Sequence, residues 1–521
     1  MVTEYDVVVV GAGSAGCAVA ARLSEDADVS VALVEAGPAD EGRLFEIPGL
    51  FAAQQKTAFD WDLQTEPEPF LDDRRRYLPR GRVLGGTSSM NTMVYVRGHA
   101  GDYDEWAALG ATGWSWADVL PWFRHSEDNE RGADAHHGVG GPLRVSDARS
   151  VHPLLTAWVD AAAEAGHARN GDFNGARQDG VGVYQFTQRD GLRASSARAF
   201  VHPALGRPNL TVLTSMHAQR IVVEGGRARG VVVDRLGATT TLTARAEVVV
   251  CAGAYLSPQL LLLSGIGPAD DLAASGIPSV VDLPGVGANL QDHPGCFLSL
   301  PTHTPDLGGA DTPANEKRLR EHGDGPLTWS EAGGFLRTHP GVDRPDVQFH
   351  AAPGIFHEEG LGRAFDHALS FGPYVNRPVS RGRVTLRSWV PSAKPRITHN
   401  YLACEEDRVV LRDGLRLALE IAGQPALAGH LKPYGAAADA GLVPTGGSDA
   451  ELDAYARRSV FSFYHPSGTC AIGDVVDAEL RVLGVDALRV ADTSVMPRLV
   501  GGNTNAPAIM IGERAAAFVR G

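Results

Sequence analysis

The sequence predicts an α/β protein that combines a parallel sheet with a second domain. Three observations near the N-terminus support this fold class. Residues 5–10 are almost entirely apolar and end in four valines, which is typical of a strand buried on both faces of a parallel sheet. The glycine-rich turn GAGSAG follows at once, and residues 17–23 have a helical pattern. A second, largely apolar strand over 29–34 ends on Glu35.

This strand–turn–helix–strand unit has the spacing of a Rossmann-like dinucleotide site. Gly11 permits the tight turn, Gly13 lets a pyrophosphate approach the backbone, and Gly16 brings the helix against the strand. The N-terminus of the helix then faces the phosphate charge. Glu35 follows about 20 residues later, where a carboxylate can accept hydrogen bonds from ribose hydroxyls. A glycine-rich turn without a ligand would not explain Glu35, but the unit alone does not distinguish FAD from NAD.

The composition argues against several classes of protein. A chain of 521 residues with 44% hydrophobic residues exceeds one ordinary core, so we expect at least two domains. The formal net charge of -15 argues against a nucleic-acid binder. No apolar run reaches the roughly 20 residues of a transmembrane helix, and the first residues lack the basic region of a signal peptide. The five scattered cysteines favour neither a disulfide framework nor a metal site, so we expect a cytoplasmic protein without bound metal.

Further motifs resemble the signatures of one enzyme family. Residues 81–91 (GRVLGGTSSMN) match the first signature of the glucose–methanol–choline (GMC) oxidoreductases, and residues 253–268 match the second. The segment 464–470 (YHPSGTC) resembles the one that carries the catalytic histidine of the family. Two shorter matches follow in the family's order, at 490–497 and 502–507. The resemblance thus extends over most of the chain and is looser only in its middle part.

The resemblance implies a flavoenzyme that oxidises a primary alcohol to an aldehyde by passing hydride to N(5) of FAD. Dioxygen or another electron acceptor would reoxidise the flavin. Some members attach FAD covalently through a histidine of the first signature, but Met90 stands there in this chain, so we expect non-covalent FAD. The cofactor contacts that the nucleotide unit and the resemblance together predict are Gly11, Gly13, Ser14, Ala15, Gly16, Glu35, Ala36, Arg82, Val83, Gly86, Ser88, Asn91, Thr92, Met93, Val94, Ala218, Ala252, Gly253, Asp492, Thr493, Asn503 and Thr504.

Alcohol oxidation needs a general base for the hydroxyl proton, and histidine suits this task near neutral pH. Among eighteen histidines, His465 is selected because its motif resembles the family's catalytic segment. Family members place a second histidine or an asparagine opposite it, and we expect this residue to be Asn505. An amide there can orient the substrate oxygen but cannot act as a base. Alternatively, Asn503 and Asn505 both cap the helix that we predict over 506–519.

The substrate side is less specific. Trp61, Phe463 and Tyr464 match positions that line the pocket of related alcohol oxidases, although ordinary core aromatics would look the same. Glu331 falls where choline-oxidising members carry a carboxylate for the cationic head group, but similar segments occur in members with uncharged substrates. No cluster of aromatic residues that could enclose a trimethylammonium group is visible in the sequence. Choline is therefore one candidate among primary alcohols.

Because the signatures are separated by long segments, both domains must be discontinuous. We assign the FAD-binding domain to 1–155, 195–300 and 456–521, and an α+β substrate domain built on an antiparallel sheet to 156–194 and 301–455. Within the second domain we expect antiparallel strands in 371–397 and an amphipathic helix over 407–421. The glycine-rich segment 308–325 is predicted to be a mobile loop near the entrance of the site.

Other functions stay open at this level. A few family members are hydroxynitrile lyases, in which FAD has no redox role, and His465 would be present in both classes. A photodecarboxylase is a more remote branch, against which His465 argues. A nucleotide-binding sensor without enzymatic activity would require neither His465 nor Asn505. The sequence indicates neither the particular alcohol nor the electron acceptor.

Overall fold

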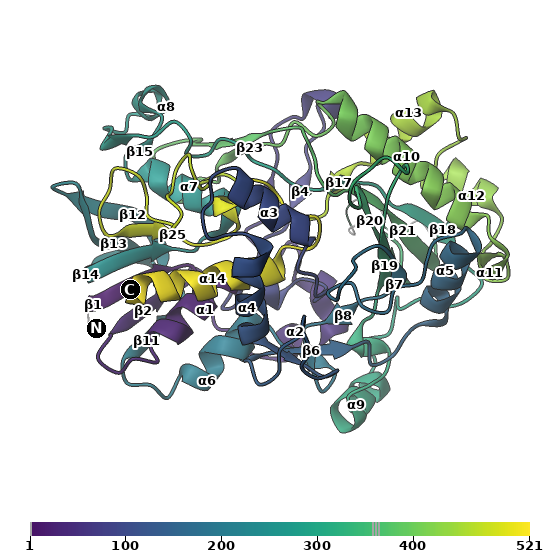
Figure 1. The fold of residues 1–521 in the computed structure, drawn as a ribbon, viewed down its shortest axis with the longest axis horizontal. Helices are drawn as coiled ribbons and strands as arrows, with labels where there is room; N and C mark the ends of the chain where they lie inside the picture. Colours follow the sequence, from purple (N-terminus) through teal and green to yellow (C-terminus); the bar gives the residue numbers. More distant parts are fainter. Residues whose placement is uncertain (1–2, 357–358, 360–361, 363–364) are drawn as a thin grey trace.

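The computed structural model describes residues 3–356, 359, 362 and 365–521. In this part of the chain, two seven-stranded sheets form the framework of the molecule. Figure 1 shows the first sheet at the left and the second at the right, with the C-terminal helix extending from the junction between them to the C-terminus at the left. The predicted α/β class, with a second domain on an antiparallel sheet, is therefore confirmed.

The first sheet contains the predicted nucleotide unit in its parallel part. Its order is β11-β2-β1-β14-β13-β12, and β25 pairs with β14. The strands are β1 (Glu4–Val10), β2 (Val31–Val34), β11 (Leu210–Leu213), β12 (His217–Glu224), β13 (Arg227–Arg235), β14 (Ala238–Val250) and β25 (Leu488–Val490). Strand β1 runs parallel to both neighbours, with Val8 opposite Ala32 and Val248. Its valines are at most 3% exposed, as expected for a strand covered on both faces.

Two helices from opposite ends of the chain pack together beside this sheet. Helix α1 (Ser14–Leu23) follows the glycine-rich turn, and α14 (Asn505–Arg520) confirms the helix predicted over 506–519. The helices approach closely because Gly512 has no side chain: a Cβ atom there would lie 2.5 Å from the carbonyl oxygen of Ala15. Their N-termini consequently lie next to each other, as Figure 1 shows for the yellow α14 beside α1.

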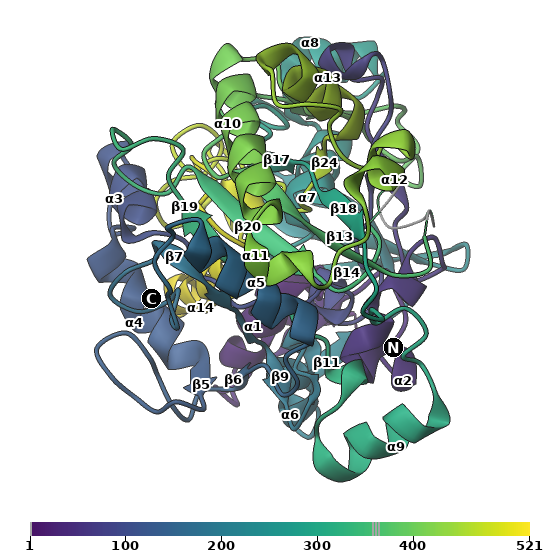
Figure 2. The ribbon, with the colours of Figure 1, turned by 90° about the vertical axis from the view of Figure 1, so that its right-hand side faces the viewer.

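The second sheet is antiparallel and has the order β24-β17-β21-β20-β19-β7, with β18 paired to β21. Its strands are β7 (Gly180–Val183), β17 (Pro294–Gly295), β18 (Leu298–Pro301), β19 (Ala332–Leu336), β20 (Val347–Ala352), β21 (Ala368–Val375) and β24 (Phe461–Ser462). One face packs against α5 (Pro153–Glu164) and α10 (Glu405–Ala422), which stand in front of the strands in Figure 2. The other face is directed toward the first sheet.

Successive side chains of β20 point to opposite faces of the second sheet, so this strand contributes apolar residues to one face and polar residues to the other. Val347, Phe349 and Ala351 are fully buried in the core under α5 and α10. The residues between them, Gln348 and His350, are polar and have their side chains on the opposite face. The antiparallel sheet thus presents a polar surface toward the first domain.

Two expectations for the second domain have different outcomes. The amphipathic helix predicted over 407–421 is confirmed as α10. The loop predicted over 308–325 is wrong, because α9 (Pro313–His322) occupies most of it. Thr312 caps this helix by accepting from the backbone N–H of Asn315, and Gly323 ends it in the left-handed region at φ 69°. The glycines that suggested a loop flank a segment rich in good helix formers.

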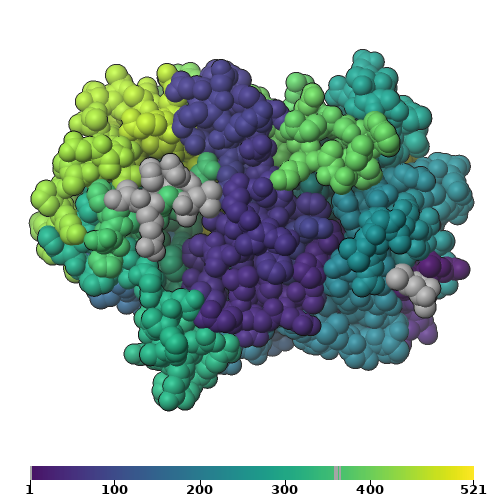
Figure 3. Space-filling model, turned by 180° about the vertical axis from the view of Figure 1, so that it is seen from behind, coloured from purple at the N-terminus to yellow at the C-terminus, as the bar shows by residue number. Residues whose placement is uncertain are grey.

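The strands expected over 371–397 belong to two different sheets. Strand β21 ends at Val375, and β22 (Arg383–Thr385) pairs only with β23 (Arg396–Thr398) in a separate hairpin. The second sheet also reaches slightly beyond the boundaries drawn at 300 and 456, since β17 and β24 belong to it. The domain boundaries therefore stay a prediction. In Figure 3 the purple N-terminal part of the chain occupies the middle of one face, between teal residues and green-to-yellow residues.

None of the helices in the described part of the chain is long and apolar enough to cross a membrane. Cys17, Cys251, Cys296 and Cys470 are buried, and Cys404 is half-buried. The buried positions agree with the small hydrophobic role that cysteine has in protein cores.

A buried group of charges connects the segment after α4 (Trp116–Ser126) to Arg97 and Asp172, which lie in other parts of the chain. The carboxylate of Glu127 lies 2.6 Å from the guanidinium of Arg97 and 3.3 Å from the ring of His137. His137 also lies 2.9 Å from Asp172. Burial alone would lower the pKa of His137, but its hydrogen bonds to Asp172 and Glu127 raise the pKa to about 9.

This cluster makes stability depend on pH. Because the folded-state pKa of His137 is raised above 6.5, its contribution is complete below about pH 6.5 and is lost as pH rises through about 9. We expect His137→Gln to lower the melting temperature clearly at pH 6, with a difference from wild type that narrows above pH 9. His136→Gln is the neighbouring control, and an equal loss at both pH values would contradict the ionic role.

Candidate active site

A cavity of about 430 Å³ lies between the two sheets, at the carboxyl ends of β1, β2 and β14. This is the edge at which parallel sheets usually bind ligands. Most of the predicted cofactor residues line it: Gly11, Gly13, Ser14, Ala15, Glu35, Ala36, Gly86, Asn91, Thr92, Met93, Val94, Ala218, Ala252, Gly253, Asp492, Thr493, Asn503 and Thr504. The predicted catalytic and substrate residues His465, Asn505, Trp61, Glu331, Phe463 and Tyr464 line it as well.

Four predicted cofactor residues lie outside the lining and support it instead. Gly16 packs α1 against the glycine-rich turn, since a Cβ atom there would lie 1.9 Å from the oxygen of Gly11. Ser88 donates to the carbonyl of Gly85 at 2.6 Å and accepts from the N–H of Ser196 at 2.9 Å. The guanidinium of Arg82 lies over an indole ring, and Val83 is fully buried. For these four residues, a direct contact with the cofactor stays a prediction.

The nucleotide end of the cavity fits a dinucleotide such as FAD. Gly11 has φ +98°, and a Cβ atom there would lie 2.5 Å from the carbonyl oxygen of Cys251, so a side chain is excluded. A Cβ atom on Gly13 would meet no atom within 4 Å, which shows that its backbone borders open space in front of α1. A phosphate group can approach the helix N-terminus at this point.

Glu35 lies at the same end, immediately after β2. Its carboxylate accepts from the N–H groups of Ala12 at 3.1 Å and of Gly37 at 2.8 Å. Each carboxylate oxygen keeps a further acceptor site, which suits a ribose hydroxyl. Burial raises the pKa of Glu35 to about 7, against these hydrogen bonds, which lower it.

Asn505 lines the same cavity as His465, and the role predicted for it opposite the histidine stays a prediction. Its side-chain oxygen accepts a hydrogen bond from Ser14 Oγ at 2.7 Å, which links the N-termini of α1 and α14. Asn503 lies beside the histidine, with its Nδ2 atom 3.3 Å from His465 Nε2. Asn505 is the first residue of α14 and Asn503 precedes the helix, so the two side chains point in different directions.

His465 is held by backbone contacts on either side. Tyr464, which precedes it, has a left-handed backbone with φ 67°, and Arg80 donates to its carbonyl at 2.8 Å. The buried carboxylate of Asp292 accepts from the backbone N–H of His465 at 2.8 Å and from that of His293 at 2.8 Å. A single carboxylate therefore fixes the two histidines relative to each other.

The ring of His465 has a defined set of partners. Its Nδ1 atom lies 2.9 Å from Nδ1 of His293, whose Nε2 atom lies 3.0 Å from the carbonyl oxygen of Asn376. Burial, together with the nearby rings of His293 and His350, places the pKa of His465 well below its ordinary value. A neutral imidazole with Nε2 next to the cavity is a competent proton acceptor.

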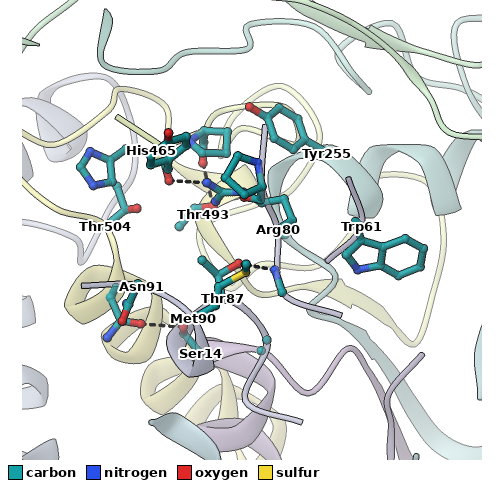
Figure 4. A pocket seen from close by; sticks show the side chains of 18 of the residues that line it. Ser14, Trp61, Arg80, Thr87, Met90, Asn91, Tyr255, His465, Thr493 and Thr504 are labelled. Carbon is teal, nitrogen blue, oxygen red and sulfur yellow. Dashed lines mark hydrogen bonds between the residues drawn. The ribbon is translucent and has the colours of Figure 1, made fainter. Parts of the chain in front are cut away.

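Of the three aromatic residues predicted for the substrate pocket, one lies on the nucleotide side of the cavity and two line the cavity near the histidines. Trp61 packs on His217, with ring centres 5.6 Å apart, and under Arg82, so its contacts lie on the nucleotide side. In Figure 4 it lies apart from His465, with Arg80 between them in that view. Phe463 lies near the histidines, 5.9 Å from the ring of His350. Tyr464 lines the cavity, and its buried hydroxyl has no hydrogen-bond partner among the residues that the structure describes.

The structure supplies an aromatic cluster that the sequence did not reveal. Phe297, Phe356, Phe461 and Phe463 line one part of the cavity. The centres of neighbouring rings are between 4.5 and 5.4 Å apart. The four rings come from three separate segments of the chain, and for this reason no cluster was visible in the sequence.

Glu331 also lines this cavity and lies just before β19 of the second sheet. Its carboxylate accepts from the indole N–H of Trp329 at 2.8 Å and lies 2.6 Å from Nδ1 of His350. His350, His293 and Gln348 were missed by sequence reasoning. The alternation of β20 could have indicated His350 and Gln348, because polar residues interrupt an otherwise apolar strand.

The chain is similar to proteins of one enzyme family along most of its length. The family model described as GMC oxidoreductase matches residues 5–295, and its C-terminal counterpart matches residues 378–512. An oxygen-dependent choline dehydrogenase from Brucella anthropi is 42% identical over 533 residues, covering 99% of this chain and 96% of that protein. One from Rhizobium etli is 41% identical over 539 residues, with coverages of 99% and 96%.

Solved structures of two oxidases are also similar to this chain over nearly its whole length. Pyridoxine 4-oxidase from Mesorbium loti has a TM-score of 0.87 and 33% identity, covering 98% of each chain. A formate oxidase variant from Aspergillus oryzae has a TM-score of 0.91 and 26% identity, covering 99% of this chain and 98% of the other. The chain therefore belongs to the GMC oxidoreductase family and is an FAD-dependent oxidoreductase that acts on CH–OH donors.

Proposed function

We propose that the protein oxidises a primary alcohol to an aldehyde, with His465 as general base and Asn503 orienting the hydroxyl. The observation that carries this proposal is the pair formed by His465 Nε2 and Asn503 Nδ2, 3.3 Å apart at the cavity. A base and an amide donor next to each other match the two hydrogen-bonding roles of an alcohol hydroxyl. Asn503 thus takes the role that the sequence suggested for Asn505.

In this arrangement the substrate hydroxyl donates to His465 Nε2 and accepts from the amide of Asn503. Bound FAD supplies the acceptor for the hydride of the alcohol carbon, and Met90 has no nucleophilic nitrogen that could attach the cofactor covalently. As the proton moves to Nε2, His465 becomes an imidazolium whose Nδ1–H still donates to His293. The positive ring then stabilises negative charge on the alcohol oxygen.

Choline is the specific substrate that the site favours for a first test. Glu331 presents a carboxylate to a cavity that is also lined by Trp329 and by the cluster of Phe297, Phe356, Phe461 and Phe463. Carboxylates and aromatic faces are the groups that recognise quaternary ammonium ions. Both relatives compared above are choline dehydrogenases by name. Dioxygen or another carrier would serve as the electron acceptor.

The first test is reduction of the bound flavin under anaerobic conditions. His465→Ala should slow reduction by about a hundred- to ten-thousandfold, the usual range for a positioned base. Asn503→Ala should slow it less, and Asn505→Ala should leave the reduction step nearly unchanged while weakening FAD retention. Because the pKa of His465 is lowered, the wild-type rate should rise with pH through an ionisation below 6.5 and then stay level.

Wild-type rates in His465→Ala would remove this residue from the mechanism. A flavin that no alcohol reduces would instead favour a redox-silent role, such as a hydroxynitrile lyase.

The second test addresses the choline head group. Glu331→Gln should raise the Michaelis constant for choline about 10- to 100-fold, because a charge-assisted contact of about 1.5–3 kcal/mol is lost. The uncharged isostere 3,3-dimethyl-1-butanol is the matched substrate control, and its Michaelis constant should change little. Equal effects on both substrates would assign Glu331 a structural role, through Trp329 and His350.

The third test concerns Glu35. If its carboxylate accepts from the ribose, FAD binding requires the ionised form, so the affinity of the apoprotein should fall as pH drops below about 7. Glu35→Gln should weaken binding at pH 8 and abolish this pH dependence. Titration of apoprotein with FAD by fluorescence quenching measures both effects. The same pH dependence in the variant would contradict the assignment.

A further inference from the structure

Neighbouring strands of the second sheet present a row of polar side chains toward the catalytic pair. His293 precedes β17, Tyr374 lies on β21, and Gln348 and His350 lie on β20, with Glu331 just before β19. These strands are adjacent in the order β17-β21-β20-β19, and Gln348 lies directly opposite Tyr374. The row therefore crosses the sheet from the base His465 to the carboxylate of Glu331.

Gln348 occupies the centre of this row and is fully buried. Its Nε2 atom lies 3.0 Å from Asn503 Oδ1, 3.1 Å from His350 Nε2 and 3.2 Å from the hydroxyl oxygen of Tyr184. Its Oε1 atom accepts from the hydroxyl of Tyr374. Gln348 does not line the cavity, so it has no direct contact with a substrate there.

The direction of these hydrogen bonds can be assigned from one end. The carbonyl of Asn376 can only accept, so His293 must carry its proton on Nε2, and its Nδ1 must accept. His465 then donates through Nδ1 to His293, which leaves the lone pair of its Nε2 for the cavity. Asn503 must present its NH2 group, not its oxygen, to that nitrogen.

The same logic continues beyond Asn503. Its oxygen faces Gln348, which must donate, and the second hydrogen of that amide is available to Nε2 of His350. His350 then carries its proton on Nδ1 and donates to the carboxylate of Glu331. A pure acceptor thus ends the chain on either side, and every intermediate group has one consistent state.

Reversal of the Gln348 amide would break this consistency. If the oxygen of Gln348 faced Asn503, the amide of Asn503 would also have to turn, and it would then present its own oxygen to His465. His465 would then carry its proton on Nε2 and could not act as a base toward an alcohol. A neutral His293 would have to donate from Nδ1, and its bare Nε2 would face the carbonyl of Asn376, so that two acceptors would meet.

We propose that Gln348 is a positioning residue that orients the amide of Asn503 toward the reacting hydroxyl and the ring of His350 toward Glu331. This inference rests on the proposed roles of His465 and Asn503. Gln348 would connect the side of the site that recognises the substrate with the side that removes the proton. It would influence the rate through the direction of hydrogen bonds, without touching the substrate.

The test compares two variants of nearly equal size. Gln348→Met removes both donors and should slow anaerobic flavin reduction about ten- to hundredfold, the effect of a misoriented catalytic group. The probe is whichever of choline, benzyl alcohol and 1-butanol reduces the wild-type flavin fastest. Gln348→Glu loses both donors when the new carboxyl is ionised but regains one when it is protonated. The rate ratio of the Glu variant to the Met variant should therefore rise as pH falls.

A double-mutant cycle separates positioning from general disruption. In an Asn503→Ala background, Gln348→Met should have little further effect on the rate constant, because its target is already absent. Gln185→Met, at a buried glutamine outside the row, is the matched control and should reduce flavin at the wild-type rate. FAD content and melting temperature of each variant identify those that fold poorly.

Distinct outcomes identify which idea fails. Multiplicative effects of Gln348→Met and Asn503→Ala, or a rate ratio that does not change with pH, would overturn the positioning role of Gln348. A wild-type rate in Gln348→Met would overturn it as well. Wild-type rates in His465→Ala and Asn503→Ala would instead contradict the proposed function itself.

Discussion

The packing of α14 on α1 is the contact on which the candidate site depends. Gly512 allows the two helices to approach until a methyl group would no longer fit against Ala15. This contact brings the last helix of the chain to the first glycine-rich turn, and Ser14 is hydrogen-bonded to Asn505 there. Both helix N-termini then face the cavity, where their dipoles favour an anionic cofactor. The same packing brings Asn503, two residues before the first residue of α14, next to His465.

A second constraint arises where the two sheets meet, because polar groups are buried there away from water. Such groups need partners, and an imidazole or an amide offers a donor on one side and an acceptor on the other. The carbonyl of Asn376 and the carboxylate of Glu331 accept only, so the groups between them have a defined direction. This direction places an unprotonated nitrogen of His465 at the cavity. In the proposed mechanism, these neighbours therefore set the protonation state of the base before a substrate binds.

Local patterns explain which elements could be predicted. A run of valines before GAGSAG and an apolar strand before Glu35 are signals contained in a few adjacent residues, and both elements formed as expected. The loop prediction for 308–325 was wrong because the glycines of this segment lie on either side of α9, whereas the residues between them favour a helix. The choice between Asn505 and Asn503 depends on a similar feature. A motif records both asparagines, but the start of the helix decides which side chain turns toward which neighbour.

The sequence by itself determined the nucleotide unit, the family and the candidate for the catalytic histidine, because each is encoded in contiguous residues whose chemistry is local. Only the tertiary structure decided the partners of that histidine. His293, Gln348, His350 and Asn503 come from strands and a helix start that are far apart in the chain. Their roles follow from distances and from the direction of buried hydrogen bonds, which depend on how two sheets and α14 pack together. The aromatic cluster of four phenylalanines likewise forms only in the folded protein, because its rings come from three separate segments of the chain.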